Sequence, residues 1–316
     1  MWRGRTSVDS HGAGASPAMT VIPYGIQNDP ETLLLAWPAG DGTIYTATGM
    51  EKNGVISASP LPLDASGNKI STLQRFGLVQ IPSGPLALSW TDTNDPPQVW
   101  LGYSYQPGQP LVEYPETWSY VDGTLIPPDI GGPAILPVGN GLYIAGTAVV
   151  TQQLYAGSGP PEGYTGAVVA EYVQTGYQSI DTPALGTTPA DTLQLAYAGV
   201  DPDNFLTISP IGFVVGVLEV GTPVVYPDHC YGGPALVTTV NGYAAAFVNV
   251  LKNIVLLYGV ENLDPAMINR VVLQDTSWHA PAVATINDVT YVAWIGTDDP
   301  TGLQRAVARQ AVRRSV

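Results

Sequence analysis

The sequence predicts an all-β fold built from six copies of one repeat, and the repeat, its turns and the lack of helical periodicity all support this prediction. Each copy has a short apolar segment, often starting Pro-Ala, then a turn and a second apolar segment that ends at an aromatic position. The copies begin at Pro17, Gly77, Pro133, Pro183, Pro234 and Pro281. Their aromatic positions are Trp37, Trp90, Gly146, Tyr197, Phe247 and Trp294.

The spacing of the copies identifies the kind of repeat. Successive copies start 60, 56, 50, 51 and 47 residues apart, as expected for four-stranded propeller blades. Asn140-Gly141 and Asn241-Gly242 are favoured two-residue hairpin turns between apolar segments. The chain is therefore predicted to form a single six-bladed β-propeller domain of antiparallel blades over residues 1–316.

The position of two tryptophans predicts how the ring closes. Trp118 lies 15 residues before Pro133 and begins a candidate outer strand, and Trp2 lies 15 residues before Pro17. We therefore expect the N-terminal segment to be the outer strand of the last blade, paired with residues 303–311. This arrangement leaves no open sheet edge at the seam.

The composition limits the partners. The chain has 26 acidic and 11 basic residues, a net charge of −15, so it would repel the phosphate backbone of nucleic acid. No apolar run is long enough to span a bilayer, so no membrane partner is expected, and the first residues do not resemble a signal peptide. The expected location is cytoplasmic, or secreted after removal of a leader.

Cysteine and histidine give little support for a cofactor. Cys230 is the single cysteine, which excludes an internal disulfide and favours a small buried hydrophobic residue. His11, His229 and His279 together offer three nitrogens for a metal, but none has the short ligand spacing typical of metal sites. No metal site and no cofactor are therefore predicted.

The repeats resemble the six-bladed β-propellers, a class that includes sialidases, fungal fucose-type lectins, and lactonase-like or strictosidine-synthase-like enzymes. The resemblance covers the whole chain but matches no single family. The Ser-X-Asp-X-Gly-X-Thr-Trp box of sialidases is absent, and the segments after each third strand share no repeated Arg, Glu and Trp set of the lectin kind.

The propeller resemblance implies where a site lies. In this fold the residues just before each innermost strand surround one mouth of the central channel. Two residues before the copy starts the sequence has Ala15, Arg75, Gly131, Asp181, Gly232 and His279. The ionisable residues predict one asymmetric site, with His279 as general acid or base, Asp181 as its carboxylate partner or an electrostatic stabiliser, and Arg75 as the group that stabilises negative charge.

Other polar residues precede neighbouring blades and are candidate ligand-binding groups: His11, Asp129, His229 and Tyr231. All three histidines lie in segments leading into blades five, six and one, which are adjacent in a closed ring. The structural alternative is that these residues are solvated or satisfy backbone groups at the strand starts.

Three functions remain open at this stage. An enzyme with one central site would perform acid–base chemistry, such as hydrolysis, elimination or cyclisation, on a neutral organic or sugar-like molecule. A lectin would bind carbohydrate between blades, and a scaffold would bind another protein on one face. The unlike residues around the channel favour the enzyme over the lectin, and the lectin is favoured over the scaffold.

Overall fold

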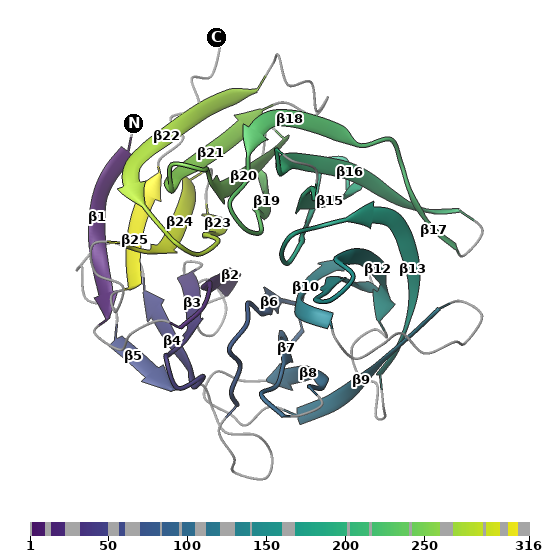
Figure 1. Cartoon of the computed structure of the whole chain (residues 1–316). Helices are drawn as coiled ribbons and strands as arrows, with labels where there is room; N and C mark the ends of the chain where they lie inside the picture. Colours follow the sequence, from purple (N-terminus) through teal and green to yellow (C-terminus); the bar gives the residue numbers. More distant parts are fainter. Residues whose placement is uncertain are drawn as a thin grey trace.

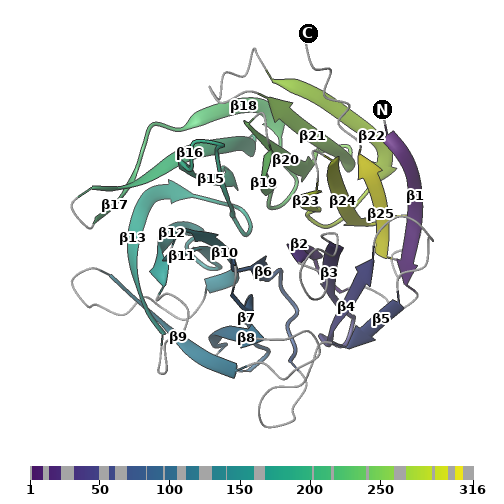
Figure 2. The same cartoon turned by 180° about the vertical axis from the view of Figure 1, so that it is seen from behind.

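The computed structural model shows strands arranged as a ring around a central channel (Figures 1 and 2). It describes residues 2–9, 14–22, 32–49, 57–60, 70–82, 84–94, 97–104, 112–120, 130–139, 141–159, 168–200, 203–214, 217–239, 242–259, 268–286, 289–297 and 303–308. Among these residues there is no helix long and apolar enough to cross a membrane.

The strands follow one another in chain order within each blade. Blade one contains β2 (Ala18–Ile22), β3 (Thr32–Pro38), β4 (Ile44–Gly49) and β5 (Ser57–Pro60). Blade two contains β6 (Gly77–Gln80), β7 (Leu86–Thr91), β8 (Val99–Ser104) and β9 (Val112–Tyr120). Blade three contains β10 (Ile130–Val138), β11 (Gly141–Ala148), β12 (Gln153–Gly159) and β13 (Val168–Gln178).

The second half of the ring repeats this order. Blade four contains β14 (Ala184–Thr187), β15 (Leu193–Ala198), β16 (Phe205–Val214), β17 (Val217–Val220) and β18 (Val224–His229). Blade five contains β19 (Ala235–Thr239), β20 (Gly242–Val248), β21 (Asn253–Gly259) and β22 (Asn269–Thr276). Blade six contains β23 (Ala282–Ile286), β24 (Val289–Ile295), β25 (Leu303–Ala308) and the N-terminal β1 (Trp2–Asp9).

Strand pairing joins these blades into five sheets, because blades two and three form one eight-stranded sheet. Their outer strands β9 and β13 pair in parallel, from Glu116 opposite Val168 to Tyr120 opposite Tyr172. Within a blade the consecutive strands are antiparallel, as in the hairpins predicted from the turns. The parallel contact between two blades is a feature that the sequence did not predict.

The N-terminal strand closes the ring as predicted. β1 pairs antiparallel with β25, with Trp2 opposite Ala308 and Asp9 opposite Leu303. β25 in turn pairs with β24, so the last blade combines the two ends of the chain. Figure 1 shows β1 on the outside of this blade, next to β25.

The aromatic position of the repeat packs the blades against one another. Trp37 and Trp294 have no exposed surface and Trp90 is 3% exposed, so these three rings lie in the core. Trp37 of blade one belongs to a cluster that also includes Ala293 and Ile295 of blade six. The core therefore lies between neighbouring blades, and a large ring fills that space in every copy except the third, which has Gly146 at this position.

The innermost strands of two pairs of neighbouring blades are linked by side-chain hydrogen bonds. The Gln80 backbone N–H in β6 donates to the Thr20 hydroxyl in β2 at 3.2 Å. The Thr187 and Thr238 hydroxyls of β14 and β19 lie 2.7 Å apart, and Thr238 also donates to the Thr187 carbonyl. These side-chain bonds fix adjacent blades where their inner strands have no backbone partner across the gap.

Candidate ligand site at the channel mouth

The mouth is the end of the channel where the six innermost strands begin, and it contains two adjoining cavities. One has a volume of about 360 Å³ and the other about 280 Å³. Both are lined by Ser16, Ile180, Asp181 and His279. Because these residues are shared, the two cavities form one depression, and the structure brings the three residues predicted to be catalytic to it: Arg75, Asp181 and His279.

Arg75 crosses the mouth. It precedes β6 in blade two, and its Nη1 donates to the carbonyl oxygen of Pro234 in front of β19 in blade five, at 2.6 Å. Two blades separate blades two and five on either side of the ring. Burial lowers the pKa of Arg75, and the nearby Asp181 carboxylate opposes that shift. The guanidinium stays charged and connects opposite sides of the mouth.

Asp181 connects two neighbouring blades. Its Oδ1 accepts from the Thr182 backbone N–H at 2.6 Å, and its Oδ2 accepts from the Gly233 N–H of blade five at 2.9 Å. Its carbonyl accepts from the Ser179 and Thr147 hydroxyls. Both carboxylate oxygens are therefore held in place by backbone donors, which gives Asp181 a structural role alongside any role toward a ligand.

Glycines just before the innermost strands of blades three and five allow the segments that contain Arg75 and Thr182 to pack closely against them. A Cβ on Gly132 would lie 2.0 Å from the Arg75 carbonyl oxygen, and one on Gly233 would lie 2.2 Å from the Thr182 carbonyl oxygen. The segments leading into blades two and four are thus packed against a glycine of the next odd blade. A larger side chain at Gly132 or Gly233 would clash with a backbone carbonyl oxygen of the preceding blade.

His279 supplies an imidazole to both cavities of the depression. The Ser277 hydroxyl fixes its backbone, donating to the His279 carbonyl at 2.7 Å and accepting from the His279 N–H at 3.1 Å. Partial burial lowers the pKa of His279, and the Asp181 carboxylate opposes this shift. The imidazole is therefore neutral near pH 7 and able to accept a proton or a hydrogen bond.

Two exposed aromatic rings flank the depression. Tyr231 is 45% exposed and Trp278 is 46% exposed, and both line the smaller cavity together with Asn204. The Lys252 ammonium lies over the Trp278 ring and 5.9 Å from the centre of the Tyr231 ring. This cation–π contact holds one face of the indole and restricts the ring.

Trp278 was not identified as a site residue from the sequence. It lies between β22 and β23 and is exposed. Asn204 and Lys252 were also missed as site residues, because each comes from a turn after a second strand. The sequence signal that was available is the large aromatic residue directly before His279 in a segment leading to the mouth.

The other predicted ligand-binding residues have different positions. Tyr231 lines the depression, as described above. His229 lies at the end of the outer strand β18, where its Nδ1 contacts the Asp203 carbonyl and its ring packs against Phe205. It does not line either cavity of the depression. His11 and Asp129 lie outside the described residues.

The described part of the chain shows the surroundings of Cys230 and whether metal-ligating side chains lie together. Cys230 is 1% exposed and its thiol donates to the Gly232 carbonyl at 3.2 Å, in accord with the predicted buried role. Burial raises the pKa of this thiol, which disfavours a thiolate nucleophile. No three His, Cys, Asp or Glu side chains form a metal-ligating group among the residues with described positions.

Comparison with known proteins supports the fold class. No protein-family model matches the chain, and no curated protein matches it. A Penicillium chrysogenum α-L-arabinanase, solved with arabinobiose, has 10% identity and a TM-score of 0.67, with 98% of this chain and 99% of that chain covered. The six-bladed β-propeller lectin of Aleuria aurantia has 11% identity and a TM-score of 0.59, with 98% and 100% covered.

A third similar structure is a protein of unknown function from Dyadobacter fermentans, with 11% identity, a TM-score of 0.60 and coverage of 97% and 98%. At these identities the likeness concerns the fold alone. The chain is thus a β-propeller whose structural neighbours include a glycoside hydrolase and sugar-binding lectins. The comparisons define the class and no particular protein within it.

Proposed function

We propose that the protein binds a neutral, sugar-like molecule in the depression at the channel mouth. The observation that carries this proposal is the pair of exposed aromatic rings, Tyr231 and Trp278, beside the polar groups of His279 and Asp181. Such a ring offers an apolar face to the C–H face of a sugar, while neighbouring polar groups bond its hydroxyls. Because Lys252 already restricts the Trp278 ring, less conformational entropy is lost when a ligand binds.

The chemistry of the neighbours agrees with this ligand class. The Penicillium arabinanase was solved with arabinobiose, and the Aleuria lectin with α-methyl-L-fucoside. One asymmetric mouth predicts one ligand per chain, whereas a lectin with sites between blades would bind several.

The test is a glycan-array screen followed by titration calorimetry with arabinobiose, α-methyl-L-fucoside and any array hit. We expect one site per chain and at least about tenfold weaker binding for Trp278→Ala, the loss expected when a central aromatic contact is truncated. Leu251→Ser is the matched control, because Leu251 is 73% exposed on the adjacent turn but does not line the depression.

Several equivalent sites per chain, unaffected by Trp278→Ala, would contradict the proposal and favour a lectin with sites between blades. Retained binding in Trp278→Ala at a single site would show that the ligand lies elsewhere on the ring. The fold of each variant is checked by its thermal unfolding midpoint, since a surface substitution away from packed residues has little effect on stability.

A second candidate function is acid–base catalysis at the same mouth, with His279 as the general acid or base. The lowered pKa of the half-buried imidazole favours it, since a neutral imidazole is a competent base near pH 7. Asp181 would orient or stabilise the imidazolium form, and Arg75 would stabilise developing negative charge. Two-carboxylate glycoside hydrolysis is disfavoured, because Asp181 is the one carboxylate among the described residues that line the depression.

The two functions make different predictions for His279→Ala. A catalytic His279 predicts loss of turnover by about 10²-fold or more, with ligand binding retained within a few-fold. A binding protein predicts weaker binding and no turnover in either form. Activity is measured on the ligand found by titration, following hydrolysis, elimination and cyclisation products by mass spectrometry, and full activity in His279→Ala would exclude the catalytic role.

A further inference from the structure

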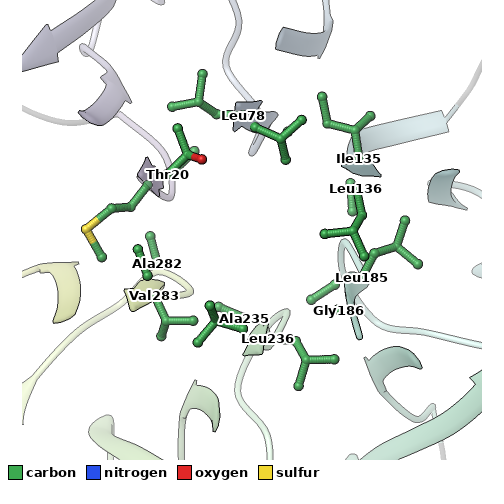
Figure 3. Close-up of a pocket in the computed structure, with 18 of the residues that line it drawn as sticks. Thr20, Leu78, Ile135, Leu136, Leu185, Gly186, Ala235, Leu236, Ala282 and Val283 are labelled. Atoms are coloured by element: carbon green, nitrogen blue, oxygen red, sulfur yellow. The ribbon is translucent and has the colours of Figure 1, made fainter. Parts of the chain in front are cut away.

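Below the mouth, the channel contains a separate cavity of about 330 Å³ whose wall is mostly apolar, with Gln80 and several threonines among the lining residues. Figure 3 shows its labelled residues, which come from all six innermost strands, arranged around an open centre. Among them are Leu78, Leu136, Leu185, Leu236 and Val283, and of the ten labelled residues only Thr20 has a polar side chain. The volume is at the lower end of the range of small-molecule pockets.

Arg75 forms the mouth end of this cavity. It precedes β6 and lines both the channel cavity and the larger mouth cavity. Its guanidinium makes one hydrogen bond, to the Pro234 carbonyl, and no ion pair joins it to a carboxylate in the described part of the chain. Other N–H donors of the five that a guanidinium carries are therefore available.

A buried cation without an anion in contact is costly, and the guanidinium fork matches a carboxylate in geometry. Asp181 is close enough to influence Arg75, but its oxygens accept from the backbone N–H groups of Thr182 and Gly233. The channel thus combines an available cationic donor at one end with an apolar wall. This combination is complementary to an anion that carries a hydrocarbon chain.

We propose that the channel is a binding site for a small aliphatic or aromatic carboxylate, with the carboxylate on Arg75 and the apolar chain between the innermost strands. At roughly 30 Å³ per non-hydrogen atom, the volume of a water molecule in the liquid, the cavity holds about ten such atoms. Octanoate has this size. The site is distinct from the sugar site above it, which uses Trp278 and Tyr231 on the exposed face.

For a carboxylate in the channel, the attraction of the nearby Arg75 outweighs the repulsion from the net negative charge of the protein. The net charge of −15 disfavours anions at long range, but surface charges are screened within about 10 Å at 0.1 M salt. Arg75 acts at contact distance and in surroundings with little water, where a charge-assisted hydrogen bond is stronger. The affinity is therefore expected to depend on Arg75 and little on ionic strength.

The test is titration of the full chain with octanoate, and with octanamide as a neutral probe of the same length. We expect one octanoate per chain and at least about tenfold weaker binding of octanamide, the loss expected for a charge-assisted hydrogen bond. Arg75→Gln should reduce octanoate affinity by a similar factor. Leu136→Trp fills the channel without changing Arg75 and should abolish octanoate binding.

Equal binding of octanoate and octanamide, or octanoate binding unaffected by Leu136→Trp, would overturn the proposal, as would no binding at all. If Arg75→Gln does not fold, the two probes and Leu136→Trp still decide the question. Trp278→Ala serves as the control, because it removes the proposed sugar contact and should leave octanoate binding unchanged. Failure of the sugar site and failure of the channel site are therefore distinguishable.

Discussion

The even-numbered and odd-numbered blades contribute differently to the channel mouth, although their innermost strands are alike. Before these strands, blades two, four and six carry Arg75, Asp181 and His279, and blades three and five carry glycines. Gly132 and Gly233 accommodate the backbone carbonyls of Arg75 and Thr182 from the preceding blades. A sixfold repeat therefore has a mouth with alternating large and small residues, so the mouth is asymmetric although the six blades are similar.

The three ionisable residues of the even-numbered blades also differ in what they contact. Arg75 and Asp181 are bound to Pro234, Thr182 and Gly233, so two of the three ionisable groups hold blades together. In the described part of the chain, the hydrogen bonds of His279 are those of its backbone with the Ser277 hydroxyl, and the residue lines the depression. Substitution at the first two positions should affect stability, and substitution at His279 should mainly affect ligand binding.

The largest expected effect comes from removing the strand that closes blade six, the blade that carries His279. Deleting residues 1–9 removes β1, which pairs along the length of β25 and covers a sheet edge. We expect the thermal unfolding midpoint to fall by about 10 °C or more, measured by circular dichroism. An unchanged midpoint would show that β1 contributes little to closure of the ring.

A large effect is also expected at an odd-blade glycine. Gly233→Ala places a methyl group 2.2 Å from the Thr182 carbonyl oxygen and 2.9 Å from Arg75 Nη1. We expect a loss of about 2 kcal/mol or more in the free energy of unfolding, measured by chemical denaturation. Gly40→Ala is the control, because its Cβ would contact nothing within 4 Å. Equal stability of the two variants would contradict the steric explanation.

The smallest effect concerns the pH dependence of stability at His279. Its pKa is lowered in the folded protein, so the unfolded chain binds this proton more readily as the pH falls below about 6.5. The contribution of His279 is therefore absent above that pH and becomes destabilising as the pH drops through the folded pKa. His279→Gln should remove this part of the acid destabilisation, measured by unfolding between about pH 5 and 8. A variant with the wild-type profile would contradict it.

The fold could be predicted because it repeats. The recurring start, turn and aromatic position of each copy predicted the blades, and the spacing of Trp2 and Trp118 predicted the closing strand. The parallel pairing of β9 with β13 was not predicted, because it joins outer strands of different blades. Contacts between blades depend on the length and path of the connections, and the repeat does not encode them.

The candidate site could be predicted only in part. Counting back from each copy located Arg75, Asp181 and His279 at one mouth, because equivalent positions in a ring face the same end. The counting could not show that Arg75 reaches Pro234 across the ring or that Asp181 binds Gly233. It also missed Trp278, since the same residue type marks both core and surface positions in this chain.

The central claim is that one asymmetric mouth, and no repeated set of sites, binds the ligand. The most direct test is a crystal structure of the protein soaked with arabinobiose and α-methyl-L-fucoside. The account predicts one sugar per chain, stacked on Trp278 or Tyr231 and bonded to His279 or Asp181. Sugar density repeated between blades, with an empty mouth, would contradict it.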